Sequence, residues 1–283
     1  MSITLPDIQK TADTRNVHID RVGVCGIKMP IRIQVPNQDG LGHTLADVVG
    51  EFELTCFLPD NVKGTHMSRF TEVLNEHVDE TGVFSHEHLQ SMAAKLATRL
   101  GSSHVFIKLE MDYFFKQTSP VSKRKGVAPI KAVLIVEHSA GSSPQVILTT
   151  GIVINGKTCC PCSREISSFD HETGKGKGAH AQRGTITLRV KHTPAVMVWF
   201  EELIQVCLES FSSPVYPVLK RPDEKHVTEH AYGNPKFVED VIRDVVVNLR
   251  KLESFDKILD YAVRVQNAES IHYHDAVAQI GTL

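Results

Sequence analysis

The sequence predicts an α+β protein in which one structural unit occurs twice. Segments with alternating apolar residues, typical of half-buried strands, flank pairs of segments with apolar residues at helical spacing. This β-β-α-α-β-β order occurs once on each side of a turn-rich stretch at residues 138–145. Hydrophobic residues make up 41% and charged residues 23% of the 283-residue chain, which excludes a disordered, collagen-like or coiled-coil protein. We therefore expect two units, residues 1–140 and 141–283, each with an antiparallel sheet and helices on one face.

Four strands and two helices are expected in the first half. Apolar side chains alternate in the predicted strands at residues 27–35, 52–58, 105–113 and 132–136. They recur at helical spacing in the predicted helices at residues 67–78 and 89–100. Ser85 is the expected N-cap of the second helix and Gly101 its stop, while Thr65 is the expected N-cap of the first.

The second half repeats this order with two long insertions. Strands are predicted at residues 146–154, 186–190, 258–265 and 276–280, and helices at residues 197–211 and 235–252. A loop at residues 155–182 is expected inside the first strand pair, and another at residues 212–234 between the helices. Long irregular loops inside a folded domain are usually functional, so we expect this half to carry most of the active site.

Charge and hydropathy exclude two classes of partner. The net charge of -2 gives no support for a nucleic-acid surface, which needs clustered basic charge. The apolar runs are too short to cross a membrane, and the first sixteen residues do not resemble a signal peptide. We therefore expect a cytoplasmic globular protein. Each predicted unit leaves open sheet edges, which predicts an oligomer that joins edges and closes a barrel.

Three of the six cysteines fall in one stretch of the first long loop, CCPC at residues 159–162. A cytosolic thiol cluster is more often metal-binding or catalytic than a disulfide framework. His180 follows in the same loop, whereas His171 lies in a glycine- and charge-rich stretch that is typical of an insertion. Cys, His and carboxylate side chains are the ligands of catalytic zinc-type sites. An inert surface thiol pair is the alternative that these residues leave open.

Ionisable residues gather in two further segments. The second long loop contains Glu224, and the C-terminal segment AESIHYHDA contains Glu269, His272 and His274. On a strand, His272 and His274 would face the same side, which suits a metal site beside the cysteine loop. A solvated charged loop and a polar edge strand are the corresponding alternatives.

The predicted start of the first helix has the features of an anion site. Lys63, His66 and Arg69 surround its first turn, where backbone N–H groups and the helix dipole favour negative charge. The Gly-x-x-x-x-Gly-Lys pattern of a P-loop is absent. A capped helix with solvated charges explains the same residues equally well.

Five motifs together resemble the prokaryotic type IB GTP cyclohydrolase I family: KGTHMSRF, CPCSREIS, GAHAQR, KRPDEKHVTEHAYGNPKFVED and ESIHYH. The resemblance covers nearly the whole chain, with the motifs in the expected order. It implies the tunnelling fold, whose β-β-α-α-β-β unit would be present twice. It also implies a homotetramer in which barrels close between subunits and active sites lie at their interfaces.

The resemblance implies a hydrolase that acts on the cyclic amidine of GTP. With one divalent metal ion (Zn, Mn or Fe) per active site, water would add at C8 of the guanine. The ring would open, formate would leave and 7,8-dihydroneopterin triphosphate would form, the first step toward tetrahydrofolate-type pterins. The positions that match the metal site are Cys160, His180, Glu224 and His272. The positions that match catalytic groups are Cys162, Glu269 and His274.

Substrate contacts are implied in the same way. Glu239 matches the glutamate that anchors the purine edge, and the basic residues at the first helix are expected to reach the triphosphate. The chain departs from the family pattern at Cys159, which precedes the CPC motif, and at the insertion HETGKGK before His180.

Two rival functions remain open from the sequence. A nitrile oxidoreductase of the same fold would use NADPH and Cys162 as a nucleophile, and would need no metal. A non-catalytic binding protein would keep the metal for structure only. The further ligand-type positions argue against the oxidoreductase, because they would then have no purpose.

Overall fold

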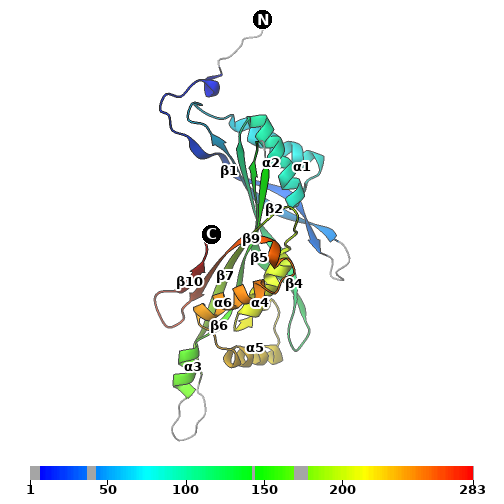
Figure 1. Cartoon of the computed structure of the whole chain (residues 1–283). Coiled ribbons are helices and arrows are strands. Elements are labelled where there is room, and N and C mark those ends of the chain that lie inside the picture. Colours follow the sequence, from blue (N-terminus) through cyan, green and yellow to red (C-terminus); the bar gives the residue numbers. More distant parts are fainter. Residues whose placement is uncertain (1–6, 37–42, 142–143, 169–177, 283) are drawn as a thin grey trace. The chain divides into compact units, whose positions relative to one another are not determined.

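The computed structural model describes residues 7–36, 43–141, 144–168 and 178–282, which divide into two compact units (Figure 1). Unit 1 takes its described residues from the chain up to Met111 and from Val133–Thr149, and unit 2 from Asp112–Ala132 and Thr150–Leu283. The contacts therefore divide the chain within long strands, and not at one point between residues 140 and 141. The predicted boundary of the sequence repeat stays a prediction.

Unit 1 has the predicted β-β-α-α-β-β order, with one short extra strand. Its elements are β1 (Ile19–Pro36), β2 (His43–Leu58), α1 (Met67–Glu80), β3 (Val83–Phe84), α2 (His86–Leu100), the part of β4 (His104–Thr118) up to Met111 and the part of β5 (Lys125–Ser139) from Val133, after a short 3-10 helix at Ile8–Lys10. The first strands form the antiparallel sequence β1-β2-β4, with β3 parallel to β1. Phe52, Leu54, Phe70 and Leu89 are fully buried where the helices cover the sheet.

The helix ends in unit 1 confirm two of three predictions. Ser85 caps α2 by accepting a hydrogen bond from the backbone N–H of His88, and Gly101 ends α2 at φ +65°. A left-handed residue at this position favours glycine, which lacks a Cβ. The prediction for Thr65 is wrong: α1 starts at Met67, and His66 occupies the N-cap position without a side-chain cap bond.

Unit 2 also has the predicted order, but a helix lies within each of its two expected loops. Its elements are β6 (Gln145–Cys159), α3 (Pro161–Ser168), β7 (Ala181–His192), α4 (Phe200–Ser210), β8 (Ser213–Pro214), α5 (Arg221–Gly233), α6 (Val238–Leu249), β9 (Ile258–Ala268) and β10 (Ala276–Ile280), with a 3-10 helix at Phe255–Lys257 before β9. The strands follow the order β10-β9-β7-β6, and β8 pairs with β6. Among the described residues, no helix is long and apolar enough to cross a membrane.

The two loop predictions were wrong for different reasons. The predicted loop at 155–182 begins too early, because β6 continues to Cys159 and α3 follows it directly. In the predicted loop at 212–234, α5 buries only Asp223, Val227 and Ala231. So few buried residues leave little apolar periodicity to reveal a helix in the sequence.

The α+β class and the antiparallel sheets with helices on one face are confirmed. In unit 2, α6 packs against α4 and β9, and Figure 1 shows α4 and α6 beside the same strands. Ile186, Leu188, Val263 and Val265 are completely buried on this face of the sheet. Strand alternation therefore turns the intervening polar side chains to the opposite face.

Phe211 joins α4 to the sheet through two glycines. The Phe211 side chain is 1% exposed, and the residue itself is the C-cap of α4. A Cβ added at Gly156 would lie 2.1 Å from Phe211 Cδ2, and one at Gly184 would lie 3.1 Å from Phe211 Cε1. Position 156 therefore needs glycine, because any side chain there would occupy the space of the ring, whereas a Cβ at position 184 would be in tight contact with its neighbours.

Gly156→Ala should destabilise the protein by about 3 kcal/mol, because a methyl group cannot share the space of a buried ring. The control is Gly233→Ala at the end of α5, where an added Cβ meets nothing within 4 Å. That change should be neutral or stabilise by up to about 1 kcal/mol. Urea unfolding of both variants measures the difference, and equal stabilities would contradict the packing described here.

Burial makes the stability of unit 1 sensitive to acid at His77. This side chain is 7% exposed, and Nε2 lies 3.2 Å from the Val83 carbonyl oxygen, to which it donates. Burial lowers the pKa of His77 below its usual value of 6.5. The unfolded chain then binds a proton more readily than the folded one, so stability is complete above pH 6.5 and falls as the pH drops below it.

His77→Gln should therefore reduce the loss of stability between pH 7 and pH 5. One proton contributes at most about 1.4 kcal/mol per pH unit to this slope. Urea unfolding at several pH values measures it, with the exposed His18→Gln variant as the control. If His77→Gln retains the full wild-type slope, His77 does not cause the acid sensitivity.

Candidate active site at the strand ends of unit 2

The cysteine stretch lies where β6 leaves the sheet. Cys159 is the last residue of β6, and Cys160 and Cys162 lie at the junction with α3 and in its first turn. The backbone N–H of Cys160 donates to the carbonyl of His180 at 3.0 Å. Ser163 adds two contacts, because its N–H lies 3.4 Å from Cys160 Sγ and its Oγ accepts from the N–H of His180 at 3.0 Å. These bonds bring Cys160 and His180 together.

A second group forms beside His180. Its Nδ1 lies 3.0 Å from Gln182 Oε1, and Gln182 Nε2 lies 3.4 Å from Glu269 Oε1. The other carboxylate oxygen, Glu269 Oε2, is 3.7 Å from His180 Nδ1 and is buried without a hydrogen-bond partner. The strand register explains why Gln182 lies close to Glu269. Arg183 of β7 pairs with Ala268 of β9, so Gln182 and Glu269 are neighbours across the strand pair.

His272 and His274 would face the same side if they lay on a strand, but the structure does not place them on one. Both residues lie in the connection between β9 and β10, and both are exposed. Their rings nevertheless stack, with centroids 5.0 Å apart and planes 17° from parallel. The short connection brings the two rings together without the alternation of a strand.

Glu224 and Glu239 occupy the first turns of α5 and α6, and both are exposed. The neighbour of Glu224, Asp223, is completely buried and holds the start of α5 in place. Burial opposes its charge, but hydrogen bonds from Ser122, Lys220 and Val121 hold the pKa of Asp223 well below its usual range. The sequence analysis missed Asp223, although Arg-Pro-Asp is a typical helix start.

The three basic residues expected at the triphosphate lie at the start of α1 in unit 1. His66 Nε2 is 3.4 Å from Asp7 Oδ2, and Arg69 Nη1 donates to the Arg99 carbonyl at 3.0 Å. The backbone N–H of Lys63 donates to the Thr11 carbonyl at 3.1 Å. Their role at a phosphate group stays a prediction.

One chain does not by itself assemble the predicted metal-ligand set. Within the ranges described above, no three His, Cys, Asp or Glu side chains are placed to hold an ion together. The chain brings Cys160 to His180 through the backbone, and His180 to Glu269 through side chains. The assignment of Cys160, His180, Glu224 and His272 as ligands stays a prediction. His171 lies outside the described residues.

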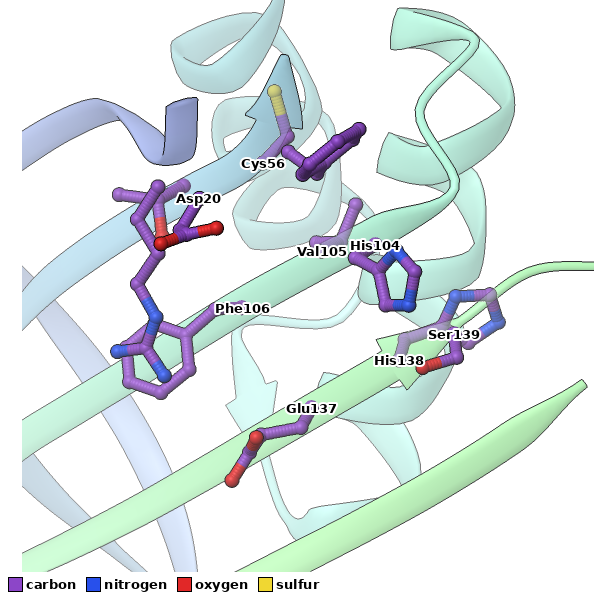
Figure 2. A pocket seen from close by; sticks show the side chains of 11 residues that line it. Asp20, Cys56, His104, Val105, Phe106, Glu137, His138 and Ser139 are labelled. Atoms are coloured by element: carbon purple, nitrogen blue, oxygen red, sulfur yellow. The ribbon is translucent and has the colours of Figure 1, made fainter. Parts of the chain in front are cut away.

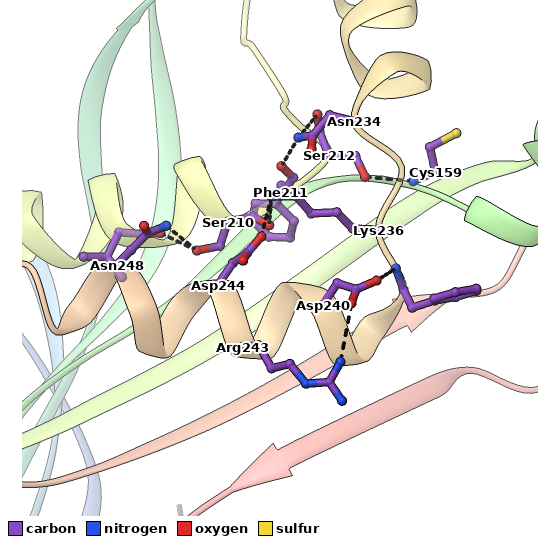
Figure 3. A network of polar contacts seen from close by, with 12 residues as sticks. Cys159, Ser210, Phe211, Ser212, Asn234, Lys236, Asp240, Arg243, Asp244 and Asn248 are labelled. Carbon is purple, nitrogen blue, oxygen red and sulfur yellow. Dashed lines mark hydrogen bonds and ion pairs between the residues drawn. The ribbon is translucent and has the colours of Figure 1, made fainter.

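Lys236 connects the cysteine stretch to the two helices that cover the sheet (Figure 3). Its backbone N–H donates to the Cys159 carbonyl at 3.0 Å. Its ammonium donates to the Ser210 carbonyl at 3.0 Å and pairs with Asp244 at 2.7 Å. Only 12% of the Lys236 side chain is exposed, so these contacts replace much of its hydration. The sequence analysis also missed this residue, since a single lysine in a loop carries no distinctive signal.

Cys159 has a structural position in this group. Its side chain is 2% exposed, its N–H donates to Ser212 Oγ at 3.1 Å, and burial raises the pKa of its thiol. A buried thiol with a raised pKa is poorly suited to ligation or nucleophilic attack. The structure thus explains why a third cysteine stands beside the CPC motif.

Replacing Lys236 should disturb both stability and the site. Lys236→Met should destabilise the protein by about 1–3 kcal/mol, because the Ser210 carbonyl and Asp244 lose their partner. The matched control is Lys225→Met on α5, whose exposed ion pair with Glu229 contributes at most about 1 kcal/mol. Urea unfolding measures both, and equal effects would contradict a structural role for the buried ammonium.

A cavity is present in each unit, and the one in unit 2 lies next to the cysteine stretch, because Lys236 lines it. One, of about 350 Å³, lies in unit 1 between the strands that carry Asp20, Cys56, His104 and Glu137 (Figure 2). The other, of about 650 Å³, lies in unit 2 and is lined by His226 and His230 among other residues. Neither includes a residue predicted for catalysis or metal binding.

A duplicated antiparallel α+β unit, with ionisable residues gathered where one sheet ends, defines a tunnelling-fold protein. The fold is similar to that of a highly active mutant of Bacillus sp. TB-90 urate oxidase, with a TM-score of 0.56 and 7% identity over 93% of this chain and 100% of that one. It is also similar to uricase from Arthrobacter globiformis, with a TM-score of 0.53 and 6% identity over 92% of each chain. At this identity the likeness concerns the fold alone.

The chain belongs to the FolE2 family of type I GTP cyclohydrolases. The family profile described as "Type I GTP cyclohydrolase folE2" matches residues 5–278. GTP cyclohydrolase FolE2 of Thiobacillus denitrificans is 38% identical over 279 residues, which cover 99% of this chain and 95% of the relative. That of Nitrosomonas eutropha is 39% identical over 276 residues, which cover 98% and 95%. The family suggested by the five motifs is therefore confirmed.

Proposed function

We propose that this chain is a GTP cyclohydrolase I that opens the guanine of GTP at C8 and releases formate. The observation that carries the proposal is the nearly full-length match to FolE2 enzymes, in a chain that brings Cys160 and Glu269 next to His180. The product is 7,8-dihydroneopterin triphosphate, which begins the route to tetrahydrofolate-type pterins. The nitrile oxidoreductase and the binding protein are the rival functions that the experiment below separates from it.

The residues of the site fit a divalent cation. Glu269 Oε2 is a buried carboxylate oxygen without a hydrogen-bond partner, and it lies 3.7 Å from an imidazole nitrogen. Thiolate, imidazole and carboxylate are the donors that zinc-type catalytic sites use. We infer that Cys160, His180, Glu224 and His272 hold the ion, which can be Zn²⁺, Mn²⁺ or Fe²⁺. When bound, it would supply Lewis-acid activation of water for attack at C8.

The remaining side chains are assigned to proton transfer and substrate binding. We assign Cys162, which is exposed in the first turn of α3, to proton transfer during ring opening, together with Glu269 and His274. Glu239 is exposed in the first turn of α6, where its carboxylate can accept hydrogen bonds from the guanine ring N–H and exocyclic amine. Lys63, His66 and Arg69 are assigned to the triphosphate.

We infer further that the chain works as a homotetramer with active sites completed between copies. Edge strand β10 has no second neighbour among the described strands. Val277 on this strand and Ile271 and Tyr273 beside it expose large apolar surfaces. An open edge with apolar side chains favours pairing with another chain. A neighbouring copy could then contribute the donors that one chain leaves apart.

Three cysteine variants test the metal site and the reaction together. Cys160→Ala should lose both bound metal and formate release from GTP, because a ligand is gone. Cys162→Ala should keep the metal but lose most turnover, by about 10²–10⁴-fold for a proton-transfer group. Cys159→Ala is the control and should be nearly silent. Metal content, formate release with and without chelator, and tetramer mass are measured for each.

The outcomes separate the three functions. Full turnover of the metal-free protein would refute metal-dependent hydrolysis. Metal-independent activity that requires NADPH and Cys162 would identify the oxidoreductase. Bound metal without formate release would identify the binding protein. A metal-free Cys162→Ala beside a metal-bound Cys160→Ala would exchange the two thiol roles.

Glu239→Gln tests how guanine is recognised. The amide lacks the second acceptor that the carboxylate offers, so GTP binding should fall by about 10²-fold or more, as expected when a site built for hydrogen bonds loses its partner. Asp240→Asn is the neighbouring control, because Asp240 caps α6 through the N–H of Phe237. Calorimetric titration with GTP and ATP measures binding. Equal affinity of the wild-type protein for both nucleotides would contradict the assignment.

A further inference from the structure

We propose that Gln182 is a positioning residue that fixes which ring nitrogen of His180 faces the reaction. The inference rests on the proposed function, in which His180 is a metal ligand. It is based on three side chains, in which the middle one contacts the other two: His180 before β7, Gln182 within β7 and Glu269 after β9. About one-seventh or less of the His180 and Glu269 side chains is exposed, at 14% and 12%.

The direction of the hydrogen bonds follows from the end of this chain of contacts. An ionised carboxylate only accepts hydrogen bonds, so the Gln182 group next to Glu269 Oε1 must be the NH₂ group. The amide oxygen of Gln182 then faces His180 Nδ1 at 3.0 Å. An amide oxygen only accepts, so Nδ1 must carry the proton of the neutral ring. The lone pair is thereby placed on Nε2.

Glu269 cannot impose this arrangement directly. Its nearer oxygen, Oε2, is 3.7 Å from His180 Nδ1, which is too far for a hydrogen bond. Gln182 spans that gap, because its amide oxygen lies 3.0 Å from His180 Nδ1 and its amide nitrogen lies 3.4 Å from Glu269 Oε1. Glu269 therefore acts on His180 through Gln182, in addition to the role beside the substrate assigned above.

The consequence for the reaction concerns Nε2. A histidine binds a metal through the nitrogen that bears the lone pair, and the hydrogen bond of the other nitrogen sets the tautomer and the ring orientation. Without Gln182, the ring of His180 can exchange tautomers and turn about its side-chain axis. Partners of this kind typically change metal affinity by about 10- to 100-fold.

The test separates the hydrogen-bond acceptor from the shape of the side chain. Gln182→Met removes both functions of the amide at similar length, whereas Gln182→Glu keeps an acceptor for the Nδ1 proton. Gln205→Met on α4 is the matched control, since Gln205 is exposed and its amide donates to Glu209 Oε1 of the same helix. All variants are full-length, and urea unfolding checks that each is folded.

The first readout is the tautomer itself. Nitrogen-15 NMR of protein labelled at histidine and stripped of metal distinguishes Nδ1–H from Nε2–H, and the His180→Asn variant identifies the His180 signals. We expect Nδ1–H in the wild type, in Gln182→Glu and in Gln205→Met, and a mixture of tautomers in Gln182→Met. Nε2–H in the wild type, or an unchanged spectrum in Gln182→Met, overturns the proposal.

The second readout is the affinity for Zn²⁺, measured by competition with a chelator. It should fall by about 10- to 100-fold in Gln182→Met and stay near the wild-type value in Gln205→Met. If His180→Asn leaves the affinity unchanged, the proposed metal site fails, while the tautomer measurement still decides the role of Gln182. If His180→Asn loses the metal and Gln182→Met does not, the metal site stands and the role of Gln182 is refuted.

Discussion

The backbone pairing of β7 with β9 is the interaction on which the arrangement of the site depends. Arg183 opposite Ala268 sets the register of two strands that are far apart in the sequence. A shift of one residue would turn each side chain of one strand to the opposite face. The completely buried Val263 and Val265 disfavour such a shift, because it would expose them. Packing of the hydrophobic core thus fixes the register of β7 and β9, and this register places Gln182 in contact with Glu269 at the end of the strand pair.

Two residues, Phe211 and Lys236, hold the helices α4 and α6 against the end of the sheet. Phe211 fills the space left free by Gly156 and Gly184, and so holds the end of α4 close to β6 and β7. Lys236 contacts the last turn of α4 and Asp244 of α6, and its backbone binds Cys159. A buried ammonium is costly unless its charge and its donors are satisfied, which makes its position well defined. The cysteine stretch is therefore held in place both by the strand that precedes it and, through Lys236, by the helices α4 and α6.

The donors that one chain assembles are fewer than a catalytic metal site needs. Three protein ligands with an open position are usual, whereas the described part of the chain places no three together. Exposed histidines at the β9–β10 connection and an open edge at β10 lie in the same part of unit 2. Association through this edge would cover apolar surface and bring further donors to the site. The oligomer proposed above would explain the open edge and the incomplete ligand set together.

The sequence by itself determined the α+β class, the order of the main strands and helices, and the family, because periodicity and contiguous motifs are local properties. Residues 276–280 were predicted as a strand and form β10 with the same bounds. The sequence did not predict α5, because this helix buries few residues. It also did not predict the stacking of the two histidine rings in the connection between β9 and β10. Only the tertiary structure decided the contacts of Gln182, Lys236 and Phe211. Their partners lie on other strands and helices, and register and packing, which no single segment encodes, bring them into contact.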